Sequence, residues 1–229
     1  MKNILKKIIP KSIKRKLLNH YDLIFKKKHI KETEYFEIII PKYNLEAKHL
    51  KNLKGIVNRK ELLKLLPKNG IVAEIGVDEG HFTKEILEFN SPNKLHLIDV
   101  WNTDRYHQGK REQVEITFKN EIEKEKVVLN LGFSTEVVQD FPDGYFDWVY
   151  IDTTHCYKNT LQELEMYSVK IKPGGFLAGH DFIIGNWKGL VKYGVIEAVY
   201  EFCIKNNWEL IYLTFDYREH PSFAIRKII

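Results

Sequence analysis

The sequence predicts an α/β protein built on a largely parallel β-sheet with helices on both faces. From Asn58 onward, strand-like runs alternate with helix-length segments, which is typical of this class. Two of these runs, FDWVYID and FLAGHD, end in acidic or histidine side chains. The last two runs follow each other without a helix, which favours an antiparallel strand near one edge. Because ligands of open parallel sheets bind beyond the carboxyl ends of the strands, the polar run ends predict an active site.

The chain has 229 residues, 44% of them hydrophobic, which is enough for one α/β domain with additional segments. No apolar run approaches the ~20 residues that span a bilayer, and the start lacks the pattern of a secretory signal. We therefore expect a cytoplasmic protein. Cys156 and Cys203 lack the spacing of metal ligands, and two cysteines do not make a disulfide scaffold, so both are expected to be reduced.

The positive charge is concentrated at the N-terminus. Residues 1–31 contain eleven Lys or Arg and one acid, Asp22, so this segment carries +10 and the remainder −5. This distribution argues against a nucleic-acid-binding body. Apolar side chains alternate with the lysines at roughly helical spacing: Ile4, Leu5, Ile8, Ile9, Ile13, Leu17 and Leu18, interrupted by Pro10. Such a segment either contacts a partner or the inner membrane face peripherally, or is a solvated helix whose apolar side packs on the body.

The elements follow in order along the chain. Residues 1–57 are expected to form a basic extension and connector, with one β-like run from Tyr35 to Ile40 that Pro41 ends. Residues 58–229 are expected to form the α/β domain. Its predicted elements are helix NRKELLKLLP; strand, glycine turn and helix in GIVAEIGVDEGHFTKEILEF; strand KLHLIDVW; helix REQVEITFKNEIEKE; strand KVVLNLG; helix STEVVQDF; strand FDWVYID; helix NTLQELEMYSVKI; turn KPGG; strand FLAGHD; helix GVIEAVYEFCIKNN; and strands WELIYLTF and PSFAIRKI.

A glycine turn follows the first strand of this domain, in the order Glu74, Gly76 and Gly80. Gly76 permits a tight turn, and Gly80 opens a helix whose N-terminus can face a ligand. The acid Glu74 favours a cationic or zwitterionic ligand, such as the amino-acid end of S-adenosylmethionine, over a pyrophosphate. The alternative is an ordinary strand-to-helix turn.

Asp99 ends the second strand, 25 residues after Glu74. An acid at this point of a nucleotide-binding sheet is placed to accept hydrogen bonds from ribose hydroxyls. The alternative is a helix cap or a loop acid. Dehydrogenases and methyltransferases both use the arrangement strand, glycine turn, helix, strand and acid.

The second half of the chain resembles one group of the class I S-adenosylmethionine-dependent methyltransferases. The segments YIDTTHCY, KPGGFLAGHDF and GVIEAVYEF are similar to methyltransferase family 24, with macrocin-type sugar O-methyltransferases as relatives. The resemblance implies a Rossmann-like, doubly wound, seven-stranded methyltransferase sheet, with the strands ending at Asp152 and Asp181 side by side. It also implies cofactor contacts from Asp152 and from Ser134, near the adenine. Members usually have glycine where this chain has Thr153.

Two carboxylates at neighbouring strand ends predict a cation site, because adjacent strands lie ~4.8 Å apart. Oxygen ligands suit Mg²⁺ or a similar divalent ion, with Asp152 and Asp181 as ligands and His180 as a third ligand or a supporting residue. A bound cation lowers the pKa of a coordinated hydroxyl. Histidine exchanges protons near neutral pH, and His155, three residues after Asp152, is the predicted general base.

These observations predict an O-methyltransferase, assisted by a divalent metal, that acts on a hydroxyl of a sugar, glycan or related small metabolite. The alternatives are a nicotinamide-dependent oxidoreductase and a non-catalytic binding protein of the same fold. The loops from Thr103 to Lys110 and from Ile183 to Tyr193 are expected to shape the acceptor pocket. Asp147 is expected to be structural, whereas His81 has no assigned role. The sequence leaves the oligomeric state open.

Overall fold

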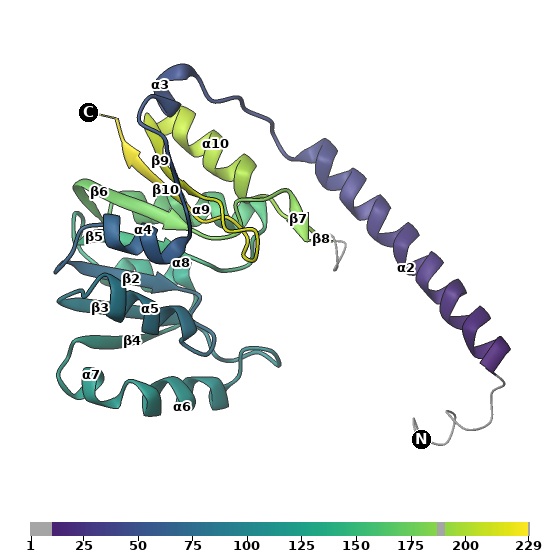
Figure 1. Ribbon diagram of the computed structural model, residues 1–229, viewed down its shortest axis with the longest axis horizontal. Coiled ribbons are helices and arrows are strands. Elements are labelled where there is room, and N and C mark those ends of the chain that lie inside the picture. The colour runs from purple at the N-terminus through teal and green to yellow at the C-terminus, as the bar shows by residue number, and fades with distance from the viewer. Residues whose placement is uncertain (1–10, 187–190, 229) are drawn as a thin grey trace. The chain divides into compact units, whose positions relative to one another are not determined.

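The chain divides into two compact units in the computed structural model, which describes residues 11–186 and 191–228 (Figure 1). The larger unit comprises residues 41–184 and 193–229, and the smaller unit comprises residues 1–40 and 185–192. The larger unit thus includes residues 41–57, which the sequence assigned to a connector. The predicted apolar positions before residue 11 lie outside the described residues.

An eight-stranded sheet, ordered β1-β9-β10-β6-β5-β2-β3-β4, organises the larger unit (Figure 1). The pairs are parallel except for those of β10, which runs antiparallel to both β6 and β9. The strands are β1 (Lys54–Ile56), β2 (Ile71–Ile75), β3 (Lys94–Asp99), β4 (Val127–Leu131), β5 (Phe146–Ile151), β6 (Ile171–Gly179), β9 (Trp208–Thr214) and β10 (Phe223–Lys227). This confirms the predicted doubly wound sheet with an antiparallel strand near the C-terminal edge. It has eight strands instead of seven because β1 pairs with β9.

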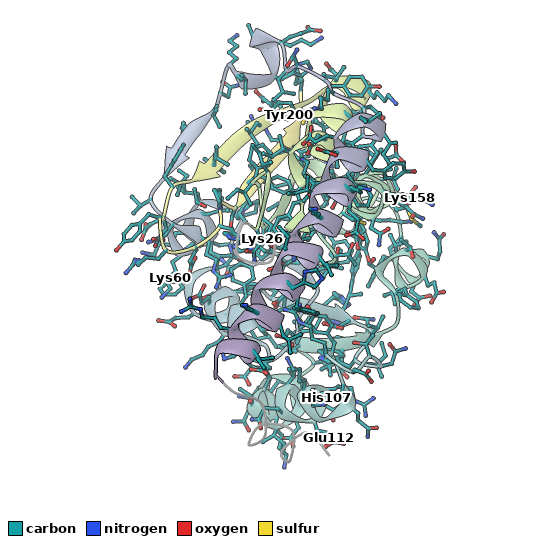
Figure 2. The ribbon with its side chains drawn as sticks, turned by 90° about the vertical axis from the view of Figure 1, so that its right-hand side faces the viewer. Lys26, Lys60, His107, Glu112, Lys158 and Tyr200 are labelled. Carbon is teal, nitrogen blue, oxygen red and sulfur yellow. The ribbon has the colours of Figure 1, made fainter. Side chains whose placement is uncertain are left out.

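Helices cover both faces of the sheet (Figure 1). The bounds are α3 (Ala47–Leu50), α4 (Arg59–Leu65), α5 (His81–Phe89), α6 (Gln108–Thr117), α7 (Lys119–Glu123), α8 (Ser134–Val137), the 3₁₀ helix η1 (Val138–Asp140), α9 (Tyr157–Ser168) and α10 (Val195–Asn206). Helices α4 to α7 pack on one face, and α8 to α10 pack on the other. In Figure 2, Lys60 marks α4, Lys158 marks α9 and Tyr200 marks α10.

Each face of the sheet has its own apolar core. Successive side chains of a strand point to opposite faces, so the fully buried neighbours Trp148 and Val149 on β5 belong to different cores. Trp148 packs with Leu62 of α4, and Val149 belongs to the core that includes Phe202 of α10. The sheet is therefore rigidly held on both sides, and its strand ends occupy fixed positions.

The β-like run predicted from Tyr35 to Ile40 is wrong. Residues 35–39 are the last turns of α2 (Lys11–Ile39), a single helix of 29 residues. A short apolar run has no periodicity that distinguishes strand from helix, and here the helix that starts at Lys11 continues through it. The helix ends before Pro41 because the residue preceding a proline is disfavoured in the α conformation.

Two further details differ from the prediction. The segment predicted as one helix from Arg111 to Glu125 forms α6 and α7, which meet at the buried Phe118. In the smaller unit, β7 (Gly185–Asn186) and β8 (Val191–Lys192) pair as a short antiparallel ribbon that the sequence did not indicate.

Candidate active site

The carboxyl ends of four parallel strands meet at one edge of the sheet. The last residue of β2, Ile75, pairs with Ile98 of β3 and with Ile151 of β5, and Ile151 also pairs with Gly179 of β6. The residues that follow these strands are therefore neighbours in space. This confirms that the strands leading to Asp152 and Asp181 lie side by side.

The glycine turn after β2 requires both of its glycines. Gly76 has a φ of +85°, and a Cβ there would lie 2.0 Å from the carbonyl oxygen of Asp152. Gly80 has a φ of +75°, and its Cβ would lie 2.8 Å from the ring of Phe118. Gly76 therefore lets the turn press against the loop after β5, and Gly80 lets α5 start close to α6 and α7.

Glu74 lies beneath this turn and not on its open side. Its side chain is 1% exposed, and its carboxyl group accepts a 2.6 Å hydrogen bond from the hydroxyl of Thr83 on α5. Burial raises the pKa of Glu74 to about 8, so the group is protonated at neutral pH. In this state Glu74 supports the turn as a neutral acid, and its cofactor contact stays a prediction.

Asp99 orders the same turn from the end of β3. One of its carboxylate oxygens accepts hydrogen bonds from the backbone N–H groups of Val77 at 2.8 Å and Asp78 at 3.0 Å. The other accepts from the N–H of Trp101 at 3.2 Å, and the indole of Trp101 donates to the carbonyl of Asp78 at 2.9 Å. Asp99 and the glycine turn thus form one pre-ordered wall. The predicted ribose contact of Asp99 is compatible with this position and stays a prediction.

A buried glutamate, which the sequence analysis missed, joins the loops after β4 and β5. Glu163 of α9 is 2% exposed and accepts hydrogen bonds from the hydroxyls of Ser134 at 2.6 Å and Thr153 at 2.7 Å. Burial raises the pKa of Glu163. Its partners are the predicted adenine-side serine and the threonine that replaces the usual glycine. A signal was present, since Thr160, Leu164 and Tyr167 define a buried helix face that includes position 163.

Two carboxylates and two histidines gather where β5 and β6 end. The Nδ1 atom of His155 lies 3.0 Å from an Oδ2 atom of Asp181. The Nδ1 atom of His180 lies 3.4 Å from the same oxygen and 3.7 Å from Oδ2 of Asp152. His155 and Asp181 both have left-handed backbones, with φ values of +57° and +56°, which are uncommon outside glycine. The fold therefore holds these four predicted residues together through unusual loop geometry.

A third histidine, His220, completes the cluster and was also missed. It lies between β9 and β10, and its Nδ1 atom bonds the second carboxylate oxygen of Asp181. Its ring lies parallel to that of His180, with 6.3 Å between the ring centres. No local motif marks His220. It reaches the site because β10 inserts between β6 and β9.

The carboxylates differ in their electrostatics. Burial favours protonation of Asp181, but the hydrogen bonds and positive charges of His180, His155 and His220 outweigh it and lower its pKa to about 2. For Asp152 burial dominates and raises the pKa. Burial disfavours the charged form of His180, yet its hydrogen bond to Asp181 and the charge of Asp152 raise its pKa overall. Asp181 is therefore the firmly ionised centre of the cluster.

The donor atoms fit a divalent cation. Among the described residues, Asp152, His155 and Asp181 each offer a ligand atom, and these atoms lie within 4.8 Å of one another. Two carboxylates and an imidazole are suitable ligands for a first-row divalent ion or Mg²⁺. The predicted ligand set contained His180 in place of His155. The Nε2 atom of His180 is buried without a hydrogen-bond partner, so this histidine also has donor capacity at the site.

The structure also shows the positions of several other residues that the sequence analysis named. Asp147 is structural, as expected, because it accepts hydrogen bonds from Ile71 N–H and Lys172 Nζ, both at 2.7 Å. The imidazole of His81 is exposed. Both cysteines are free. The ring of Tyr193 lies 4.9 Å from that of His155, on the predicted acceptor side. Residues 187–190 of the predicted acceptor loop from Ile183 to Tyr193 lie outside the described residues.

Comparison with known proteins points to one class of enzyme. Residues 73–182 match a family model, Methyltransf_24, that describes a methyltransferase domain. This range contains the glycine turn, Asp99 and the cluster at the ends of β5 and β6. None of the curated proteins matches the sequence.

Solved structures of methyltransferases share the fold. The pyocyanin biosynthetic protein PhzM superposes with a TM-score of 0.56 and 14% identity, over 74% of this chain and 54% of that chain. The tRNA methyltransferase TrmK of B. subtilis gives 0.54 and 15%, over 76% and 67%. SMU.1697c of Streptococcus mutans, solved in complex with SAH, gives 0.54 and 14%, over 74% and 96%. This chain thus spans only about half of PhzM.

The family match identifies a methyltransferase domain over residues 73–182, and the fold is that of solved methyltransferases; both support the predicted enzyme class, an S-adenosylmethionine-dependent methyltransferase. They favour that class over the nicotinamide-dependent and non-catalytic alternatives. At 14% to 15% sequence identity, the structural matches show the fold but do not identify the methyl acceptor.

Proposed function

We propose that this chain, an S-adenosylmethionine-dependent methyltransferase, methylates a hydroxyl group of a sugar, glycan or related small metabolite with the help of a divalent cation. The observation that carries the proposal is the cluster of carboxylates and histidines at the ends of β5 and β6. Asp152, His155 and Asp181 bring ligand atoms within 4.8 Å of one another, and the Nδ1 atom of His180 lies 3.7 Å from Asp152 and 3.4 Å from Asp181. The resemblance of the D-x-x-H-x-Y and G-G-x-x-x-x-H-D segments to macrocin-type enzymes supports the same acceptor class.

The cofactor is proposed to lie over the ends of β2, β3 and β4. Gly76, Gly80 and Asp99 form the ordered wall described above, and Ser134 lies on the neighbouring loop. The first turn of α5 provides backbone N–H groups toward this edge. In this arrangement the methyl-donating end of the cofactor would face the ends of β5 and β6, where the acceptor is proposed to bind.

The acceptor hydroxyl is proposed to bind at Asp152 and Asp181. These carboxylates and His180 would hold a divalent cation, which when bound would lower the pKa of a coordinated hydroxyl. His155 is the proposed base: its Nδ1 atom lies 3.0 Å from Asp181, which orients the ring and leaves Nε2 to face the acceptor. The side chain of His155 is 26% exposed, so an acceptor can reach it.

Methyl transfer is then a displacement at the sulfonium carbon, in line with the sulfur leaving group. The hydroxyl oxygen forms the new bond to carbon, the carbon–sulfur bond breaks, and S-adenosylhomocysteine leaves. Holding the two reactants at near-attack distance is a large part of the catalysis of such a step. The rigid sheet edge serves this purpose because both binding halves are fixed to adjacent strands.

Calorimetric titration with S-adenosylmethionine tests the cofactor half of the proposal. We expect one binding site, with affinity reduced at least about tenfold by Asp99→Ala, which removes both the turn hydrogen bonds and the proposed ribose contact. Asp143→Ala, an exposed acid at the opposite edge of the sheet, serves as the control. Absence of binding by the folded wild type would refute the proposal.

The roles of His155 and His180 are distinguished by measuring turnover and divalent-ion affinity in a variant of each residue. If His155 is the base, His155→Gln abolishes turnover but leaves divalent-ion affinity nearly unchanged, because the glutamine amide can still donate to Asp181. His180→Gln, in contrast, weakens the ion's binding. The exposed His81 provides the control His81→Gln. Loss of ion affinity in His155→Gln would instead make His155 a ligand and require another base.

The acceptor class is tested with labelled methyl donor. Sugar nucleotides, free glycans and transfer RNA are offered in parallel, because the structural neighbours include an RNA methyltransferase. Label in a sugar hydroxyl that is lost on addition of a chelator supports the proposal. Label in RNA alone would contradict the acceptor class while leaving the cofactor assignment intact.

A further inference from the structure

Helix α2 consists of two segments of opposite charge. Residues 11–31, the basic segment, contain eight Lys or Arg and a single acid, Asp22, which gives a charge of +7. Residues 32–39, the acidic segment, contain three glutamates and no basic residue. Since the helix is continuous from Lys11 to Ile39, the two segments form one rod with distinct ends.

The acidic segment ties the helix to its own unit. The carboxylate of Glu37 lies 3.5 Å from the Nζ atom of Lys192 on β8, and the Lys192 side chain is only 4% exposed. This ion pair, with a buried lysine and a partly exposed glutamate, joins the acidic segment to the ribbon of β7 and β8. The end of α2 near residue 39 is therefore the structural end, and the basic segment requires a separate explanation.

The basic segment exposes an apolar stripe. Ile13, Leu17 and Ile24 are 49%, 55% and 55% exposed. At 3.6 residues per turn they lie within about 40° of one another around the helix axis. Two other exposed apolar side chains, Leu23 and Ile30, lie about 100 to 120° from the centre of this stripe around the helix axis. Three large aliphatic side chains on one line are costly in water unless another surface covers them.

Basic side chains border this stripe. The exposed Lys16 and Lys27 lie about 60 to 80° from its centre, so their ammonium groups flank it on one side. The exposed Lys26 is labelled on α2 in Figure 2 and adds to the same charge. A line of aliphatic side chains bordered by lysines is suited to bind a surface that has a negatively charged outer layer and an apolar layer beneath it.

We propose that the basic segment of α2 binds the surface of an anionic lipid membrane. Ile13, Leu17 and Ile24 enter the boundary between headgroups and acyl chains, and the lysines contact lipid phosphates. Nucleic acid offers the same phosphates but no apolar layer for the stripe, so the lipid surface is the better match. None of the helices in the described part of the chain is long and apolar enough to cross a bilayer. The contact is therefore peripheral, and it is independent of the proposed chemistry.

Co-sedimentation of the full chain with vesicles tests this proposal. We expect binding to phosphatidylcholine vesicles that contain about one third phosphatidylglycerol, little binding to phosphatidylcholine alone, and release by salt. The double variant L17Q/I24Q should lose at least about tenfold in vesicle affinity, because two aliphatic side chains no longer enter the lipid. The matched control L23Q/I30Q removes two similarly exposed side chains that lie about 100 to 120° from the stripe centre, and it should stay within about twofold.

Other outcomes would overturn the proposal. One is equal loss in both double variants, and another is equal binding to neutral and anionic vesicles. Binding to transfer RNA but not to vesicles would assign the segment to nucleic acid, and self-association that L17Q/I24Q abolishes would assign the stripe to a second copy. Cofactor binding and helical content, measured in every variant, confirm that the protein is folded.

Discussion

Asp181 is the residue on which the site converges. Its two carboxylate oxygens contact three histidines that come from three different loops. Burial by itself would favour the protonated acid, so these partners are what keep the carboxylate ionised. The geometry of a bound cation would therefore depend on side chains that do not all touch it.

His220 is expected to position Asp181. Replacing it in His220→Ala removes the bond to one carboxylate oxygen, and such supporting partners are typically worth about 10- to 100-fold in metal affinity or activity. We expect divalent-ion affinity to fall by this factor while S-adenosylmethionine affinity stays the same, as measured by calorimetry. His81→Ala is the control. Unchanged ion affinity in His220→Ala would remove His220 from the site.

Glu74 predicts a specific dependence of stability on pH. Its pKa is about 8 in the folded protein and 4.5 for the ordinary side chain, so the folded state holds this proton more tightly. The resulting stability is fully present below about pH 4.5 and is lost as pH rises through about 8, on the order of a few kcal/mol in total. In urea unfolding, Glu74→Gln should flatten this decline. The exposed Glu88 gives the control Glu88→Gln, and an equal effect of both variants would contradict the assignment.

At the residue scale, part of the candidate site could be predicted from the local sequence. Asp152, His155, His180 and Asp181 lie at or just after the ends of two predicted strands, and the resemblance to methyltransferase family 24 implied that these strands are neighbours. Their meeting could therefore be foreseen. His220 and Glu163 could not be assigned in this way, because one depends on the insertion of β10 and the other on the orientation of α9.

The glycine turn is the element that joins the two halves of the site. Gly76→Ala would place a Cβ 2.0 Å from the carbonyl oxygen of Asp152 in a left-handed backbone. Gly144 also has a positive φ, +64°, but a Cβ there meets nothing within 4 Å. We therefore expect Gly144→Ala to cost about 1 kcal/mol in unfolding free energy, and Gly76→Ala about 3 kcal/mol or more.

Calorimetry on Gly76→Ala and Gly144→Ala distinguishes the effect of backbone strain from that of the close contact between the turn and Asp152. Gly76→Ala should also weaken S-adenosylmethionine binding, since the turn moves away from β5, whereas Gly144→Ala should not. Equal destabilisation by the two substitutions would mean that the close approach of the turn to Asp152 has no energetic weight.

At the element scale, the alternation of strand-like and helix-length runs in the sequence predicted most of the order of strands and helices. It failed from Tyr35 to Ile40, where a short apolar run fits either periodicity and the preceding helix decided the outcome. It also missed β1, whose three residues pair with β9, a strand far away in the sequence. These are cases in which tertiary context determines a short segment.

At the scale of the whole molecule, the chain consists of the larger unit, here called the body, and the smaller unit that contains α2. Because the body has its own cores on both faces of its sheet, removal of residues 1–31 should leave it folded. We expect the truncated protein to keep its thermal transition within a few degrees and its S-adenosylmethionine affinity within about twofold. Unfolding of the truncated chain would show that the basic segment is part of the body.

The central claim concerns a divalent cation between the strands that end at Asp152 and Asp181. The most direct test is calorimetric titration of Mg²⁺ and Mn²⁺ into the protein saturated with S-adenosylhomocysteine, in the wild type and in Asp181→Asn. We expect a single ion site in the wild type that disappears in the variant, while S-adenosylhomocysteine still binds. Failure of the folded wild type to bind either ion, or equal ion affinity in Asp181→Asn, would contradict the account.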